Sequence, residues 1–147
     1  MNDIEARIAK HTSLSPLVLR VGLGLVFLAH AYAKATIYTF AGTERFFEAF
    51  GFPGWTVYPV FAAELVGGIA LIVGYRTRIV APALIAVMLG ALKPHLGNGW
   101  MFTNAGGGWE YVAFLIAALV AQTFAGAGEH SLDAAAARLV VRQPARA

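Results

Sequence analysis

The chain contains no cysteine among its 147 residues. Disulfide bonds, thiolate-held zinc, iron–sulfur clusters and thiol relays within this chain are therefore excluded. Charged residues are also scarce, at 13% of the sequence, while 59% is hydrophobic; a soluble domain has about 25% charged residues. So much apolar surface indicates a lipid environment. The basic residues are few and scattered, so the net charge of +3 does not indicate a nucleic-acid partner.

Four apolar windows come close to the ~20 residues that a membrane-spanning helix needs. They cover residues 16–38, 56–74, 79–96 and 109–127. Pro16 follows Ser15 at the start of the first window, where the missing N–H costs no helical hydrogen bond. Pro94 is expected to kink or end the third window. We predict an all-α integral membrane four-helix bundle, formed as a single domain by residues 1–147.

The distribution of lysine and arginine predicts the orientation. Seven of the eleven lie in the two tails and in the turn between the second and third windows. Positively charged loops favour the cytoplasmic side, so both termini are expected in the cytoplasm. The predicted location is the cytoplasmic (inner) membrane, with several crossings. The tails are expected to form short interfacial helices, the first around Ile4 and Ile8 and the second beginning at Ser131.

Two further features concern the connections and the helix contacts. After the first window, Thr43 is expected to cap a short helix that lies over the outer end of the bundle as a lid. Phe47 and Phe50 of this segment should face the bundle. Small residues allow helices to approach closely. The glycines expected to do so are Gly22, Gly24, Gly67, Gly68 and Gly90.

Six ionisable residues lie in or at the ends of the apolar windows and, on the topology above, fall in the outer half of the membrane: His30, Lys34, Glu64, Lys93, His95 and Glu110. A charge at the helix centre costs roughly 2.5–3.5 kcal/mol on insertion scales, so such groups usually pair or line a cavity. His30 and Lys34 are four residues apart and share a helix face, and Glu64 should lie at a comparable depth. These three side chains are therefore expected to meet.

Two interpretations of this cluster are open. A buried Lys34–Glu64 ion pair can serve only to set the helix register. A polar pocket for a small ligand is favoured, because two histidines, two lysines and two carboxylates exceed what register needs. In the pocket, His30 would exchange a proton and Glu64 would be the carboxylate that orients the His30 ring. Lys34 would be a charge partner in the same cluster. The other candidate ligand-binding residues are His95, Glu110, Lys93 and Phe27.

Metal and haem sites are not expected. The sequence has no recognised ligand spacing such as H-E-x-x-H. A haem held between His30 and His95 is disfavoured because His95 is expected nearer the surface. At the cytoplasmic end, Arg20 is expected to play a structural role by pairing with Asp133, with Glu129 as the alternative partner.

Several short motifs occur in a characteristic order between Arg20 and Asp133. They are Arg20; His30 with Lys34; Gly51-Phe52-Pro53; Glu64-Leu65-Val66-Gly67-Gly68; Arg76-Thr77-Arg78; Ala91 with His95; Glu110-Tyr111; and Ser131-Leu132-Asp133. In order and spacing, this chain resembles the DoxX family of small four-helix membrane proteins. One departure is Ala31, where the family usually has glycine after the histidine.

The resemblance implies a membrane subunit of redox systems. The expected function is a quinone- or quinol-interacting membrane subunit of an oxidoreductase system, with quinone as cofactor, membrane lipid around it and a redox enzyme as partner. A homo-oligomer is a further possible assembly, and whether the chain itself is catalytic stays open. The competing function is a non-catalytic assembly or chaperone subunit. A small-solute carrier is less favoured, because the sequence shows no inverted repeat.

Overall fold

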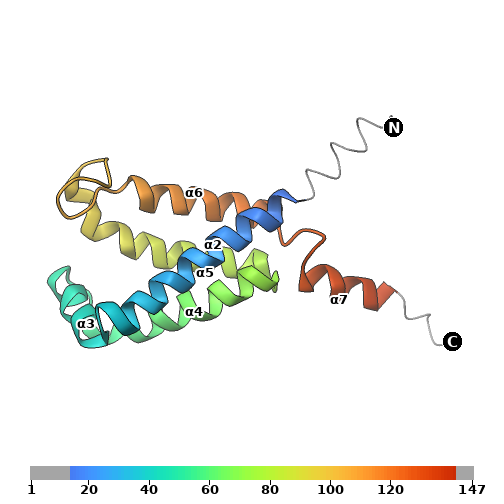
Figure 1. Cartoon of the computed structure of the whole chain (residues 1–147), viewed down its shortest axis with the longest axis horizontal. Helices are drawn as coiled ribbons and strands as arrows, with labels where there is room; N and C mark the ends of the chain where they lie inside the picture. The colour runs from blue at the N-terminus through green and yellow to red at the C-terminus, as the bar shows by residue number, and fades with distance from the viewer. Residues whose placement is uncertain (1–13, 142–147) are drawn as a thin grey trace.

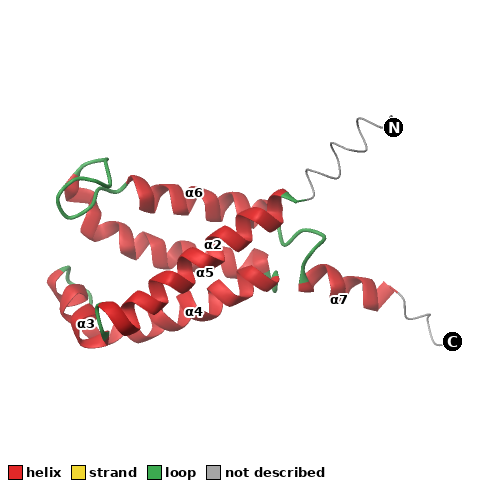
Figure 2. Cartoon of the chain, in the orientation of Figure 1, coloured by secondary structure: helices red, strands yellow, loops and turns green. Residues whose placement is uncertain are grey.

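The structure is a computed structural model that describes residues 14–141. Over that range the chain forms helices joined by loops and turns, without a strand (Figure 2). The predicted all-α class is confirmed. Four helices make up the bundle in Figure 1: α2 (Ser15–Tyr32), α4 (Val57–Val73), α5 (Thr77–Leu92) and α6 (Glu110–Ala125). The predicted interfacial segment around Ile4 and Ile8 lies outside the described residues.

Within the described range, three helical stretches are long and apolar enough to cross a membrane. They are Ser15–Ile37, Gly54–Val73 and Thr77–Asn98, of 23, 20 and 22 residues. Short helices extend α2, α4 and α5 to these lengths: the π-helix η1 (Ala33–Ile37) and the 3₁₀ helices η2 (Gly54–Thr56) and η3 (Lys93–Asn98). The fourth predicted window forms the apolar helix α6, which at 16 residues is shorter than the other three.

The bundle buries one apolar core and leaves other large apolar side chains outside it. Helix α2 packs against α4, α5 packs against α6, and α4 and α5 are also in contact. The core includes Leu23, Phe27, Leu71, Leu84, Met88, Leu115 and Leu119. Exposed large apolar residues include Val18, Leu25, Val66, Ile69, Ile79, Leu89, Phe114 and Phe124. Helices that are apolar all round are typical of membrane spans.

Glycine determines how closely α4 approaches both α2 and α5. A Cβ atom on Gly24 would lie 2.7 Å from the carbonyl oxygen of Gly68, and one on Gly67 would lie 3.0 Å from Leu84. The predicted close approach is therefore confirmed for these three glycines. It is wrong for Gly22 and Gly90, because a Cβ atom on either would meet nothing within 4 Å.

The end of the bundle where α2 begins is closed by a buried arginine. The Arg20 guanidinium donates hydrogen bonds to the backbone carbonyl oxygens of Leu71 (2.9 Å), Ala127 (3.1 Å), Ile72 and His130. Two of these carbonyls, those of Leu71 and Ile72, belong to the last turn of α4, where carbonyl oxygens carry partial negative charge. Arg20 thus connects α2, the end of α4 and the segment after α6.

Asp133 stabilises a different helix end. It lies in the first turn of α7 (Leu132–Val141), and its carboxylate accepts the backbone N–H groups of Arg76 (2.9 Å) and Thr77 (3.4 Å) at the start of α5. A carboxylate is favoured there by the positive end of the helix dipole. The predicted Arg20–Asp133 pair is therefore wrong. Within residues 14–141, Arg20 pairs with neither Asp133 nor Glu129.

Candidate functional site

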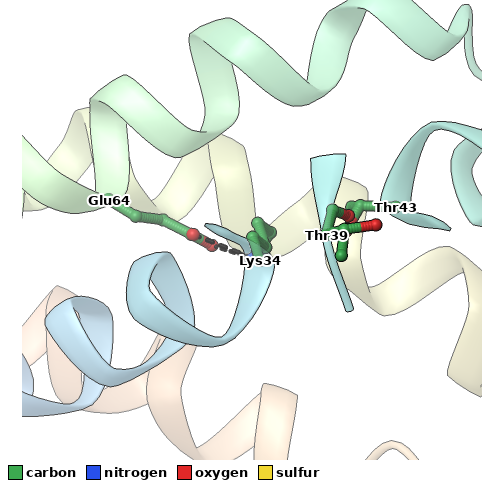
Figure 3. Close-up of polar contacts among 4 residues, drawn as sticks. All are labelled: Lys34, Thr39, Thr43 and Glu64. Carbon is green, nitrogen blue, oxygen red and sulfur yellow. Dashed lines mark hydrogen bonds and ion pairs between the residues drawn. The ribbon is translucent and has the colours of Figure 1, made fainter. Parts of the chain in front are cut away.

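A charge pair connects two helices inside the bundle, as Figure 3 shows. The Lys34 Nζ atom lies 2.8 Å from both carboxylate oxygens of Glu64. Glu64 is 2% exposed and Lys34 is 14% exposed, so the pair is largely shielded. The predicted contact between these two residues is confirmed. The alternative, in which Glu64 faces lipid, does not occur.

Lys34 lies in an unusual part of its helix. The segment η1 is a π-helix, and the Tyr38 N–H donates to the Ala33 carbonyl oxygen five residues back, at 2.9 Å. π-helical turns are rare in proteins overall, but those that do occur are often found at functional sites. The wider turn changes the direction of the side chains. The sequence has no proline or glycine between Ala33 and Ile37 that would have indicated this distortion.

The charge pair borders a cavity of about 730 Å³ at the end of the bundle where η1, η3 and the short helix α3 (Phe40–Ala49) meet. This end is called the site end below. Ionisable or polar side chains on the cavity wall are His30, Lys34, Tyr38, Thr43, Thr56, Glu64, His95 and Tyr111. The rest of the wall is mainly apolar and includes Phe46, Phe47, Phe50, Phe52, Val60, Val87, Met88 and Leu115. The volume is typical of sites for small organic molecules, at roughly 300–1,000 Å³.

Helix α3 forms the predicted lid, but it begins four residues earlier than expected. The cap is Thr39, whose side-chain oxygen accepts the Gly42 N–H at 3.2 Å. Thr43, the predicted cap, lies inside the helix and donates to the Thr39 carbonyl oxygen at 2.9 Å (Figure 3). Thr39 has a φ of 61°, which residues other than glycine seldom adopt, and the chain reverses there. Phe47 and Phe50 line the cavity, as predicted.

His30 lies on the cavity wall beside an aromatic residue that sequence reasoning did not select. The rings of His30 and Tyr111 are nearly parallel, at 25°, with centroids 6.5 Å apart. Both side chains are exposed, so this pair stands where the cavity opens to the outside. Tyr111 was recognised only as part of the Glu110-Tyr111 motif, and its position next to Glu110 was the one signal that could have identified it.

His95 is fixed by the loop that follows it. Its Nδ1 atom lies 2.9 Å from the carbonyl oxygen of Gly107. A carbonyl oxygen can only accept, so Nδ1 carries the proton and a neutral ring keeps its lone pair on Nε2. Asn98 also donates to Gly107, at 3.0 Å, and to Gly106, at 3.0 Å. The loop thus sets the ring orientation and tautomer of a histidine on the cavity wall.

The other three candidates lie outside the cavity lining. Phe27 is 1% exposed and belongs to the bundle core. The Glu110 carboxylate accepts the Phe102 N–H at 2.9 Å and so stabilises the loop. The Lys93 ammonium lies 4.8 Å from the centroid of the ring of Phe52, which is a cavity residue. The structure does not bring these three together with His30 and Glu64.

The arrangement can bind and exchange protons with a planar, largely apolar ligand. Glu64 takes two of the three N–H donors of Lys34, which leaves a third for a ligand oxygen. Histidine can accept or release a proton near neutral pH. The phenylalanine rings offer flat apolar surface. No group of three or more His, Asp or Glu side chains suited to a metal ion occurs within residues 14–141.

Comparisons with known proteins agree on a membrane family. A family model described as DoxX matches residues 15–104. The chain is 33% identical over 95 residues to the Bacillus subtilis (strain 168) protein named "Putative oxidoreductase CatD", which covers 60% of this chain and 69% of that protein. It is 37% identical over 65 residues to "Inner membrane protein YqjF" of Escherichia coli (strain K12), covering 44% of this chain and 48% of that protein. No solved structure matches this chain.

Proposed function

The chain belongs to the DoxX family, and we propose that it is a quinone- or quinol-interacting membrane subunit of an oxidoreductase system. The observation that carries this proposal is the cavity of about 730 Å³, whose apolar aromatic wall is interrupted by one ion pair and two histidines. A quinone head group needs a flat apolar site together with hydrogen-bond and proton partners for its oxygens. The name of the Bacillus subtilis relative, "Putative oxidoreductase CatD", supports a redox role.

In this proposal all four bundle helices cross the membrane. Helix α6 is short, but it packs along α5, one of the three stretches long enough to cross, which supports a crossing for α6 as well (Figure 1). Its exposed side chains include Phe114 and Phe124, which are suited to lipid. Both termini lie in the cytoplasm, by the positive-inside rule. The inner membrane as location is supported by the name of the Escherichia coli relative.

The side chains divide the work as follows. The phenylalanines of α3 hold a planar ring, and the free N–H donor of Lys34 binds one ring oxygen. The neutral form of His95 keeps its lone pair on Nε2, because Nδ1 donates to Gly107, and this nitrogen can accept a hydroxyl proton. Glu64 holds the Lys34 ammonium in place and offsets its charge. His30, at the opening of the cavity, can pass protons to water.

The electrons and protons must both be accounted for. Oxidation of a quinol releases two protons and two electrons. In the proposed arrangement the protons leave through His95 and His30, and the electrons pass to the partner oxidoreductase. The chain then contributes the binding site and the proton path, and the partner contributes the electron acceptor.

The test is to purify the chain from its native membrane and to measure the quinone in an organic extract. We expect about one quinone per chain, displaced by a short-chain ubiquinone analogue, and a large loss in the variant Phe47→Ala/Phe50→Ala. Phe124→Ala, an exposed side chain at the end of α6 opposite the cavity-lining residues, is the matched control. Quinone no richer than in an unrelated membrane protein prepared in the same way would refute the proposal.

A non-catalytic assembly subunit is the second candidate function. It is favoured by one observation, namely that the Lys34–Glu64 pair joins η1 to α4 with both carboxylate oxygens engaged. Such a pair can specify helix register without any ligand. In that case the variant Glu64→Gln would lower thermal stability while an intact complex stayed active. In the quinone proposal the assembled complex loses turnover.

A further inference from the structure

The end of the bundle opposite the cavity has a second pocket, of about 440 Å³, that the proposed function does not use. It lies between the start of α5, the end of α6 and the start of α7. Residues on its wall include Arg76, Arg78, Gly126, Gly128, Ser131 and Asp133. This set is called the basic pocket below. It contains two guanidinium groups and one carboxylate, so it is net positive.

Arg78 lies against backbone rather than against an acidic group. A Cβ atom on Gly126 would lie 3.0 Å from Arg78 Nε and 3.4 Å from Nη2, so the guanidinium packs over this glycine. Gly126 has a φ of +71°, and its carbonyl oxygen accepts a hydrogen bond from the buried Gln122 side chain at 2.6 Å. The space that Arg78 occupies therefore depends on glycine at this position, and Gln122 fixes the turn that provides it.

Arg76 is positioned in a comparable way. Its backbone is left-handed, with a φ of 47°, and its N–H donates to Asp133 at 2.9 Å. Its guanidinium lies 5.4 Å from the centroid of the Tyr75 ring, a cation–π contact that leaves the N–H donors free. Within residues 14–141, neither Arg76 nor Arg78 uses its guanidinium in a hydrogen bond or ion pair. Among the described residues, Asp133 forms no ion pair with either guanidinium, and its oxygens accept the amides that begin α5.

The pocket lies at the depth where a membrane would end. The apolar helices α4 and α6 end there, α5 begins there, and α7 projects from the same end of the bundle in Figure 1. Helix α7 exposes Leu132 and Leu139 together with Arg138, as expected of a helix that lies in the membrane interface. Basic pockets at this depth meet lipid head groups.

From these contacts we propose that the basic pocket binds the phosphate group of an anionic phospholipid in the leaflet at this end of the bundle. Guanidinium groups bind phosphate oxygens through paired N–H donors, and both arginines have donors to offer. The lipid would hold the start of α7 against the turn between α4 and α5. This proposal does not depend on the quinone site at the other end.

The test is native mass spectrometry of the purified full chain, titrated with phosphatidylglycerol or with zwitterionic phosphatidylcholine. We expect one saturable phosphatidylglycerol site, about thirtyfold tighter than phosphatidylcholine, because each arginine near anionic lipid contributes about fivefold. The variant Arg76→Gln/Arg78→Gln should remove that preference. Arg138→Gln is the matched control, since it removes one arginine from the same end, outside the pocket, and should keep the preference.

Further measurements distinguish binding of the whole lipid from binding of free phosphate, and they control for misfolding of the double variant. Inorganic phosphate should fail to displace phosphatidylglycerol when present in large molar excess; displacement would show that the pocket takes free phosphate and would overturn the lipid assignment. Equal binding of the two lipids by the wild type, or a preserved preference in the double variant, would also overturn it. If the double variant does not fold, Arg78→Gln alone should lower the preference about fivefold.

Discussion

The ammonium of Lys34 and the carboxylate of Glu64 form one ion pair between the π-helical end of the first helical stretch and the middle of α4, with both N–O distances at 2.8 Å. The pair forms part of the cavity wall. It therefore holds two helices together and also presents a free N–H donor to any ligand. The two roles can be separated by experiment. Removing both charges leaves no unpaired charge between the helices, but it abolishes the N–H donor for a ligand.

Removing one charge of this pair should cost more than removing both. Glu64→Gln keeps the shape of the side chain but leaves the Lys34 ammonium unpaired, which costs about 3–5 kcal/mol for a buried pair. The double variant Lys34→Met/Glu64→Gln has no uncompensated charge and should unfold at a higher temperature than Glu64→Gln. Thermal unfolding in detergent measures this. Losses that simply add would show that the two residues act independently. In the quinone extraction, both variants should lose the ligand.

The α2–α4 crossing should tolerate no side chain at Gly24. The Cβ atom of Gly24→Ala would lie 2.6 Å from Ile72 Cγ1 and 2.7 Å from the Gly68 carbonyl oxygen, so the helices must separate. We expect a loss of about 1–3 kcal/mol, typical of overpacking. Gly22→Ala is the control, because its Cβ atom meets open space and alanine favours the helix by up to ~1 kcal/mol. Equal unfolding temperatures for the two variants would contradict the observed crossing.

Arg20 should not be replaceable by lysine. Its guanidinium reaches carbonyl oxygens on α4 and on the segment after α6 at once, whereas an ammonium is a single point with three donors. Arg20→Lys should lower stability by at least about 2 kcal/mol, since hydrogen bonds to charged groups contribute about 1.5–3 kcal/mol each. Arg138→Lys is the control, because Arg138 is exposed and makes one backbone contact, with Glu129. Thermal unfolding of both variants measures this difference in stability.

The loop before α6 should control the cavity through His95. A Cβ atom on Gly108 would lie 2.5 Å from the Trp100 carbonyl oxygen and 2.6 Å from that of Gly99, so Gly108→Ala must displace the loop. His95 is bonded to the neighbouring Gly107, and its ring should turn when the loop moves. We expect weaker quinone binding with most of the fold intact. Gly97→Ala, whose Cβ atom meets nothing within 4 Å, should bind normally. Unchanged quinone binding in Gly108→Ala would show that His95 does not contribute to the binding site.

The orientation can be tested with single cysteines, because the chain has none of its own. Ala105 is exposed in the loop at the site end, and Ala137 is exposed on α7 at the other end. In intact cells, an impermeant thiol reagent should label Ala105→Cys and leave Ala137→Cys unlabelled until the cells are opened. The reverse pattern would place the cavity on the cytoplasmic side and the basic pocket outside.

Much of the architecture could be derived from local sequence properties. The helical stretches follow from windows of apolar residues, because a lipid-facing helix must be apolar along its whole length. The Lys34–Glu64 contact followed from counting residues at 1.5 Å each, since two unlike charges at equal depth in neighbouring helices have few other partners. Phe47 and Phe50 were correctly placed towards the bundle, because a lid buries its larger apolar face.

The tertiary structure decided which groups complete each site. Arg20 binds carbonyl oxygens and Asp133 binds amides, because every residue carries these backbone groups and only the fold shows which remain unpaired at helix ends. Phe27 faces the core while Tyr111 faces the cavity, since the rotation of each helix about its axis is set by packing against its neighbours. Sequence thus determined the membrane helices and the depth of their charges, and packing determined which atoms those charges meet.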